Sequence, residues 1–163
     1  MIPHWAKYLP WNLIMSNAEK SGVDPILVAA IVGSESKGKG WKCRFEKNYE
    51  WLFNPKRYVN ELNSEDTEII LQKISWGPMQ IMGAVAREAG YMSDLSELSK
   101  PSVGIKWGCD FLRRLCDAYG KSNMCDIVAI WNGGPGARIG NGTYKNQKYV
   151  DKVMGCYSEL TKG

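Results

Sequence analysis

The strongest hydrophobic pattern in the chain is the run 26–32, in which every residue is apolar. Asp24 is a good N-cap residue, and Pro25 suits the first helical position, where a missing N–H costs nothing. A helix that is apolar on every side is buried in a core, and this run is too short to span a bilayer. The pattern therefore predicts one buried helix over residues 23–38, ended by Gly38 and Gly40.

This helix carries one carboxylate near its C-terminal end. Glu35 lies seven residues after Val28 and four residues after Ile31, so it continues a stripe of core residues. Partial burial and the negative end of the helix dipole both disfavour a charged carboxylate, so we expect its pKa to be raised. A carboxylic acid that keeps its proton near neutral pH suits general-acid cleavage of a glycosidic bond. The alternative is a surface glutamate at a frayed helix end.

The other segments predict further short helices and little strand. Residues 38–53 are irregular and rich in aromatic and charged side chains, so they form a loop held to the core or the wall of a cleft for sugars. Seven or eight short helices, with no repeat and no linker, predict a mainly α fold in a single domain over residues 1–163. Besides the helix over 23–38, we expect one helix that ends at Gly22, one near 56–62 and one over 64–74. Two more are expected from Pro78 to Gly90 and from Pro101 to Gly120. The last two are a helix that follows a cap at Ser122 or Asn123 and extends to residue 131, and a helix over 144–160.

Composition narrows the function classes. The chain has 163 residues, of which 44% are hydrophobic, and this is ample for a packed core. The net charge of +4 suits an anionic polymer such as a bacterial cell wall, but no run of Lys and Arg resembles a basic arm, so we expect no nucleic-acid partner. The single histidine, His4, argues against a Ser-His-Asp triad, a Cys-His pair or a His-rich zinc site. We therefore expect no metal and no cofactor, and hydrolytic chemistry would have to use carboxylates.

Targeting signals and cysteines favour synthesis in a cytosol. The N-terminal segment lacks the positive region and apolar core of a signal peptide, and no stretch is typical of a transmembrane span. The five cysteines are odd in number and include no C-x-x-C pair, which predicts reduced thiols. We expect a monomer without stable membrane insertion.

Three short motifs occur together in this chain: E-S at 35–36, G-P-M-Q at 77–80 and I-W-N-G-G at 130–134. In this order and spacing they resemble the soluble lytic transglycosylases (SLT type), relatives of goose-type lysozyme in glycoside hydrolase family 23. The likeness extends over about residues 11–154 and includes V-D-P-I-L-V-A-A-I-V before Glu35 and N-Q-K-Y-V-D-K-V near the C-terminus. It implies an α+β, lysozyme-like fold.

The resemblance also implies a context and a substrate. The absence of a signal-peptide pattern and the small size are similar to phage members of the family, such as endolysins. Such an enzyme would be made in the cytoplasm of a bacterial host and would act in the periplasm or cell wall after release, or as part of a virion. The expected partner is the glycan strand of peptidoglycan, cleaved at the β-1,4 bond between N-acetylmuramic acid and N-acetylglucosamine.

The resemblance assigns roles to particular residues. Glu35 matches the catalytic glutamate, which acts first as acid and then as base and gives a 1,6-anhydromuramic product. The substrate-binding positions that match the family are Ser36, Met79, Gln80, Asn132 and Tyr149.

The chain departs from the family in two places that matter for the chemistry. Trp131 stands where the family has a tyrosine before Asn132, and an indole N–H cannot accept a hydrogen bond, so Tyr144 or Tyr149 would have to supply the hydroxyl. The segment between Glu35 and Gly77 is longer than usual. It contains Glu46 and Glu50, either of which could be the second carboxylate that a hydrolytic lysozyme needs, about 6.5–9.5 Å away in inverting enzymes. A binding module that has lost its chemistry is a further alternative.

Overall fold

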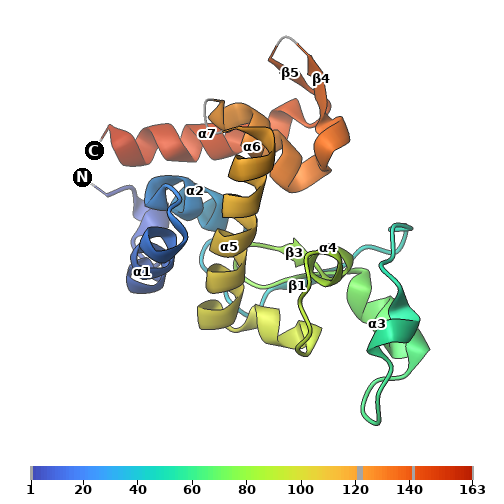
Figure 1. Ribbon diagram of the computed structural model, residues 1–163. Helices are drawn as coiled ribbons and strands as arrows, with labels where there is room; N and C mark the ends of the chain where they lie inside the picture. The colour runs from blue at the N-terminus through green and yellow to red at the C-terminus, as the bar shows by residue number, and fades with distance from the viewer. Residues whose placement is uncertain (1, 121–122, 141, 163) are drawn as a thin grey trace.

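The computed structural model describes residues 2–120, 123–140 and 142–162. Within these ranges the chain folds mainly into α-helices, with two small antiparallel sheets, and the predicted fold class is confirmed (Figure 1). The helices are α1 (Trp11–Ser21), α2 (Pro25–Ser36), α3 (Glu65–Gln72), α4 (Gly83–Glu88), α5 (Pro101–Tyr119), α6 (Met124–Gly133) and α7 (Gln147–Thr161). The strands are β1 (Cys43–Phe45), β2 (Ile74–Trp76), β3 (Ile81–Met82), β4 (Arg138–Gly140) and β5 (Thr143–Tyr144), and the 3-10 helices are η1 (His4–Ala6), η2 (Pro55–Tyr58), η3 (Leu95–Ser99) and η4 (Pro135–Ala137).

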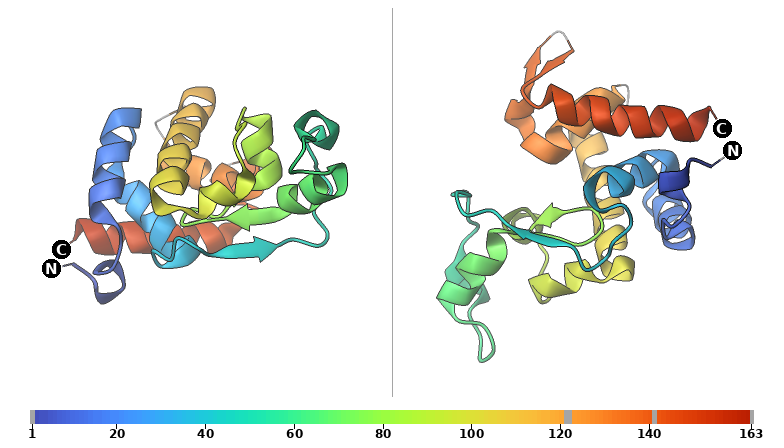
Figure 2. Two further views of the ribbon diagram at one scale, coloured as in Figure 1. Left: turned by 90° about the horizontal axis from the view of Figure 1, so that it is seen from below. Right: turned by 180° about the vertical axis from the view of Figure 1, so that it is seen from behind.

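Helix α5 runs through the middle of the molecule and connects its two sides. Helices α1 and α2 lie on one side of it, and the three-stranded sheet with α3 and α4 lies on the other (Figures 1 and 2). Helix α2 packs against both α1 and α7, and α5 packs against α1 and α6. The C-terminal end of α2 therefore lies where the helical side of the molecule meets the sheet.

The buried helix predicted from the sequence is confirmed as α2. The Asp24 side chain accepts a hydrogen bond of 2.8 Å from the backbone N–H of Ile26, and Pro25 occupies the first turn. Residues 27–34 and Ser36 are all buried. The predicted end was too late, because Lys37 rather than a glycine leaves the helix, in the left-handed conformation with φ 54°.

The prediction of a helix beginning at Pro78 was wrong. Residues 81–82 form β3, which pairs antiparallel with β2 through Ser75 opposite Met82, and β2 in turn pairs with β1. Two left-handed positions make the tight turn before β3: Gly77 at φ 73° and Gln80 at φ 49°. A helix through this segment is impossible with these dihedral angles, so the helix is restricted to α4.

Three other boundaries differ from the sequence prediction. The helix expected near 56–62 is only the 3-10 turn η2, and the last helix begins at Gln147 because Tyr144 belongs to the hairpin of β4 and β5. Helix α6 continues through Asn132 to Gly133. Asn123, one of the two predicted caps of α6, accepts hydrogen bonds from the first turn of that helix, and Ser64 caps α3 by accepting one from the N–H of Thr67. Ser122, the other candidate cap, lies outside the described residues.

A buried ion pair joins α3 and α4 on the side of the molecule that contains the three-stranded sheet. Arg87 of α4 donates from Nε to Glu68 of α3 at 2.7 Å, and the side chains are 4% and 0% exposed. Burial alone would raise the pKa of Glu68, but hydrogen bonds from Arg87, Gln72 and Asn63 outweigh it and lower that pKa. The same guanidinium donates to the carbonyls of Tyr91 and Ser93, so it also fixes the segment after α4.

Candidate active site

Glu35 lies in the last turn of α2 and contacts α7, the C-terminal helix. Its side chain is partly buried, and the phenolic hydroxyl of Tyr149 donates a hydrogen bond of 2.6 Å to Oε1 of Glu35. The two residues are 114 positions apart in sequence, and they meet because α2 packs along α7. Of the two tyrosines proposed to replace the family's hydroxyl, the structure therefore brings Tyr149 to the glutamate.

Two lysines hold the C-terminal end of α2 from different parts of the chain. Lys152 of α7 donates a hydrogen bond of 2.5 Å to the carbonyl of Ser34, and Lys42, just before β1, donates to the carbonyl of Glu35. The last carbonyls of a helix lack partners within the helix, and cations complement the negative end of its dipole. The lysines therefore fix the backbone that carries Glu35.

Burial raises the pKa of the Glu35 carboxyl above its ordinary value, and this is the dominant effect. The hydrogen bond from Tyr149 and the positive charges of Lys152, Lys42 and Arg44 act in the opposite direction but do not cancel it. Burial and the neighbouring Glu35 also raise the pKa of Tyr149 well above its ordinary value. Tyr149 thus keeps its proton and remains a hydrogen-bond donor to Glu35 at all ordinary pH values.

The motif at 77–80 contacts the C-terminal end of α2. The hydroxyl of Ser36 donates to the carbonyl of Pro78 at 2.8 Å and accepts from the N–H of Gly38. Gln80 donates to the carbonyls of Gly77 and Lys42 and accepts from the Ser75 hydroxyl. Ser36 is thus buried and bonded to backbone, and Gln80 braces the turn and the segment before β1.

Met79 lies beneath the surface rather than on it. Its side chain is fully buried against α5, where a Cβ on Gly108 would lie 2.1 Å from the Met79 sulfur. Gly104, one turn earlier, similarly lets Pro78 approach the helix. Two glycines of α5 therefore set how closely the 77–80 turn approaches this helix.

The motif at the end of α6 has one half-buried and one exposed member. The ring of Trp131 packs on Phe111 of α5, with centroids 5.6 Å apart, and Asn132 is exposed and accepts a hydrogen bond of 2.9 Å from Asn146. Tyr144 is buried, and its hydroxyl donates to Asp126 at 2.8 Å. The hydroxyl of Tyr144 therefore bonds a residue of α6 and not Glu35.

The two candidates for a second carboxylate differ in their surroundings. Glu46 pairs with Arg44 of β1, and Glu50 is exposed. Among the described residues, the charged groups that act on the Glu35 carboxyl are the cations Lys152, Lys42 and Arg44. The electrostatic environment of Glu35 is accordingly basic.

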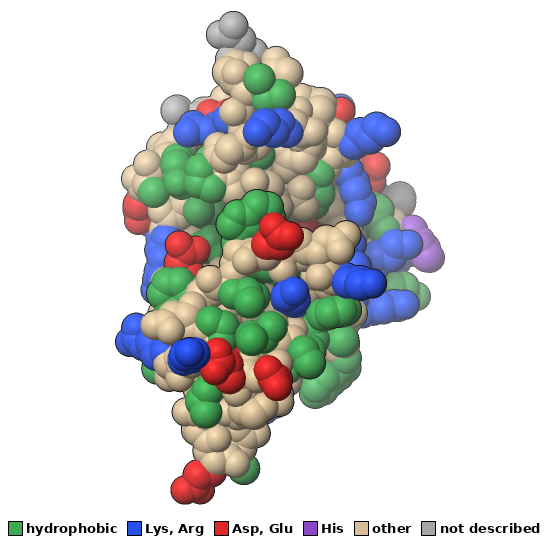
Figure 3. Space-filling model, turned by 90° about the vertical axis from the view of Figure 1, so that its right-hand side faces the viewer, with side chains coloured by type: hydrophobic (Ala, Val, Ile, Leu, Met, Phe, Trp, Pro, Cys, Tyr) green, Lys and Arg blue, Asp and Glu red, His purple; other side chains and the backbone are tan. Residues whose placement is uncertain are grey.

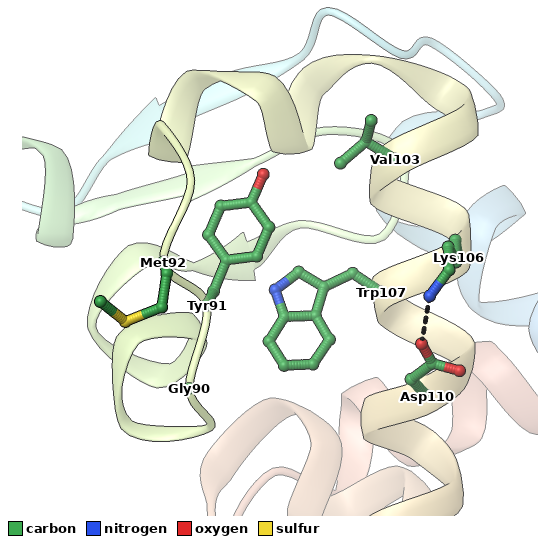
Figure 4. Close-up of a pocket in the computed structure, with 7 residues that line it drawn as sticks. All are labelled: Gly90, Tyr91, Met92, Val103, Lys106, Trp107 and Asp110. Carbon is green, nitrogen blue, oxygen red and sulfur yellow. Dashed lines mark hydrogen bonds and ion pairs between the residues drawn. The ribbon is translucent and has the colours of Figure 1, made fainter.

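A separate hollow of about 240 Å³ lies on the N-terminal half of α5 and contains none of the predicted site residues (Figure 4). Tyr91 and Trp107 stack in it with ring centroids 5.7 Å apart, and Lys106 pairs with Asp110 at its rim. The two rings lie beside one another in Figure 4, so this hollow is formed largely by side chains that contact each other.

Sequence reasoning missed Lys42 and Lys152. A signal for Lys152 was present, because it follows Tyr149 by three residues and therefore lies on the same side of the helix. No local pattern identifies Lys42, which contacts the carbonyl of Glu35 from the loop just before β1.

A family model, the transglycosylase SLT domain, matches residues 12–153 of this chain. The matched range includes Glu35, the 77–80 turn and Tyr149. No curated protein and no solved structure matches the chain significantly. In the described parts of the chain, no helix combines the length and the apolar character that crossing a bilayer requires.

Proposed function

This chain belongs to the transglycosylase SLT domain family, whose members degrade peptidoglycan, and on that premise we propose that Glu35 is its single catalytic acid and base. The bond cleaved is the β-1,4 link between N-acetylmuramic acid and N-acetylglucosamine. The observation that carries the proposal is the hydrogen bond between Tyr149 and Glu35 within a partly buried site.

The proposed reaction has two proton transfers through one carboxyl group. The protonated Glu35 gives its proton to the glycosidic oxygen, and the bond from that oxygen to the muramyl C1 breaks. The carboxylate then removes the proton of the muramyl 6-hydroxyl, whose oxygen bonds to C1 and closes a 1,6-anhydro ring. Glu35 ends the cycle protonated, so no second carboxylate and no water are consumed.

The neighbours of Glu35 suit both halves of this cycle. Burial favours the protonated acid that the first step needs. The Tyr149 hydroxyl and the positive charges of Lys152 and Lys42 stabilise the carboxylate that exists between the steps. Because Tyr149 bonds Oε1, it also fixes the orientation of the carboxyl.

The hydrolytic alternative has less support. A hydrolase would need Glu46 or Glu50 to activate water, but Glu46 is paired with Arg44 and Glu50 is exposed. Ser36, Met79, Gln80, Trp131 and Asn132 are proposed to shape the glycan site, with the first three acting through the turn that supports α2.

The direct test is lysis of purified peptidoglycan by the Glu35→Gln variant, which keeps the size and one acceptor of the side chain. We expect a loss of about 100-fold or more in rate, because that is the usual contribution of a general acid and base. The far-UV circular dichroism should be unchanged. A variant that folds and clears cell walls at the wild-type rate would overturn the proposal. A Glu46→Gln, Glu50→Gln double variant serves as the matched control and should stay active.

A further inference from the structure

The segment between α2 and the end of β1 has an unusual composition for an exposed stretch. Residues 37–45 contain four cations, Lys37, Lys39, Lys42 and Arg44, and no acidic residue. The same nine residues include Trp41 and Phe45. The aromatic character of this segment is not used by the proposed reaction.

The aromatic side chains of this segment are held outside the core. Trp41 is 73% exposed and Phe45 is 54% exposed. Tyr8, in the N-terminal segment, is 79% exposed. It lies next to Gly38, because a Cβ on Gly38 would be 3.3 Å from the backbone carbonyl oxygen of Tyr8. We call Tyr8, Lys37, Lys39, Trp41 and Phe45 the basic aromatic surface. In Figure 3, blue and green side chains gather at the right-hand side, beside and below the purple histidine, which is His4.

The basic aromatic surface is distinct from the candidate active site. Successive side chains of a strand point to opposite faces, so Phe45 lies on the face of β1 opposite Arg44. Arg44 and Lys42 act on the Glu35 carboxyl, and neither belongs to the surface. The hollow on α5 is also lined by no residue of the surface.

We propose that the basic aromatic surface binds the face of an anionic phospholipid membrane. Trp, Tyr and Phe have an apolar ring that favours the headgroup region, and lysines beside them pair with anionic headgroups. The lysines favour an anionic partner, and the exposed rings beside them favour one that also offers an apolar boundary, which a bilayer has and an anionic cell-wall polymer lacks. The binding is peripheral, since no helix in the described residues is able to span the bilayer.

The experiment is co-sedimentation of the full chain with vesicles of phosphatidylcholine alone or mixed with phosphatidylglycerol. We expect binding only to the vesicles that contain phosphatidylglycerol, with an affinity that falls as salt is raised. Replacing Lys37 and Lys39 with Gln should weaken binding by about fivefold for each lysine. Replacing Trp41 and Phe45 with Ala should weaken it by roughly tenfold or more.

A matched control removes the same kinds of side chain elsewhere. Lys56 is exposed on η2 and Leu62 is 92% exposed, so a Lys56→Gln, Leu62→Ala variant should bind vesicles like the wild type. The Glu35→Gln variant should also bind like the wild type, so failure of this proposal and failure of the proposed function are separable. Absence of binding to phosphatidylglycerol vesicles, equal binding to both vesicle types, or an unchanged affinity of the Trp41 and Phe45 variant would overturn the proposal. If these substitutions weaken retention on lipid-free peptidoglycan and leave vesicle binding unchanged, the surface binds the glycan and the proposal is wrong.

Discussion

The hydroxyl of Tyr149 lies 2.6 Å from Oε1 of Glu35 and donates a hydrogen bond to it. The tyrosine comes from the first turn of α7 and the glutamate from the last turn of α2. The raised pKa of Tyr149 keeps its hydroxyl protonated, so this contact persists in both protonation states of the glutamate. It orients the carboxyl and favours its charged form, which are the two properties that a group serving as acid and then as base requires.

The Tyr149→Phe variant tests the value of this contact. The ring and its packing remain, but the hydrogen bond to a charged group is lost, and such bonds are worth about 1.5–3 kcal/mol. We expect kcat to fall by about 10- to 100-fold. The pKa of Glu35 should rise, because the lost donor favoured the carboxylate.

Tyr157→Phe is the matched control for Tyr149→Phe. Tyr157 lies on the same helix and donates a hydrogen bond of 2.8 Å to the carboxylate of Asp24, far from the end of α2 that carries Glu35. This variant should lose some stability and leave kcat unchanged. Equal losses of kcat in the two variants would show that the Tyr149 effect is only structural.

Lys152 should set the pH range of activity. Its positive charge lowers the pKa of Glu35, so Lys152→Met raises that pKa. The first step needs the protonated acid, so activity is lost as pH rises through the pKa, and the alkaline limb of kcat/KM should move to higher pH. The measurement is kcat/KM against pH on soluble glycan fragments.

Two comparisons test whether the shift comes from the positive charge at position 152. Lys152→Arg keeps the charge and should retain the wild-type alkaline limb. Lys148→Met removes an exposed cation from the same helix and should also leave the limb in place. A shift in the Lys148 variant as large as that in the Lys152 variant would contradict a specific role.

The raised pKa of Glu35 has a consequence for stability. Above the unfolded-state pKa the unfolded chain has released this proton while the folded chain still holds it, so the glutamate makes stability fall as pH rises towards the folded-state pKa. Glu35→Gln removes this dependence. We therefore expect the variant to have a higher Tm than the wild type at pH 7, and the difference to shrink as pH falls towards the ordinary carboxyl pKa.

This comparison is made by scanning calorimetry of both proteins over a series of pH values. A Tm difference that is independent of pH would mean that Glu35 titrates normally. A wild type more stable than the variant at neutral pH would mean that ionised Glu35 stabilises the fold, contrary to a pKa raised by burial.

Local signals were sufficient for the parts of the fold that depend on neighbouring residues. Asp24 and Pro25 define the start of α2, and the apolar run after them buries it, because capping and burial act within a few residues. The candidate acid was found in the same way, from its place on the stripe of this helix.

The parts that depend on distant contacts could not be predicted in this way. Pro78 is a good residue for a first helical turn, yet β2 pairs with the segment after it and makes a strand there. Glu68 and Arg87 are 19 residues apart and meet only in the folded core. The choice between Tyr144 and Tyr149 was likewise left open, because only the packing of α7 on α2 decides which hydroxyl meets Glu35.

The most direct test of the central claim is mass spectrometry of the muropeptides released from purified peptidoglycan by the wild-type chain. If Glu35 alone serves as acid and base, the new muramic ends carry the 1,6-anhydro ring, and they are lighter by one water than the hydrolysed ends. Release of reducing muramic ends in its place would show that water attacks C1, and would contradict the single-carboxyl mechanism.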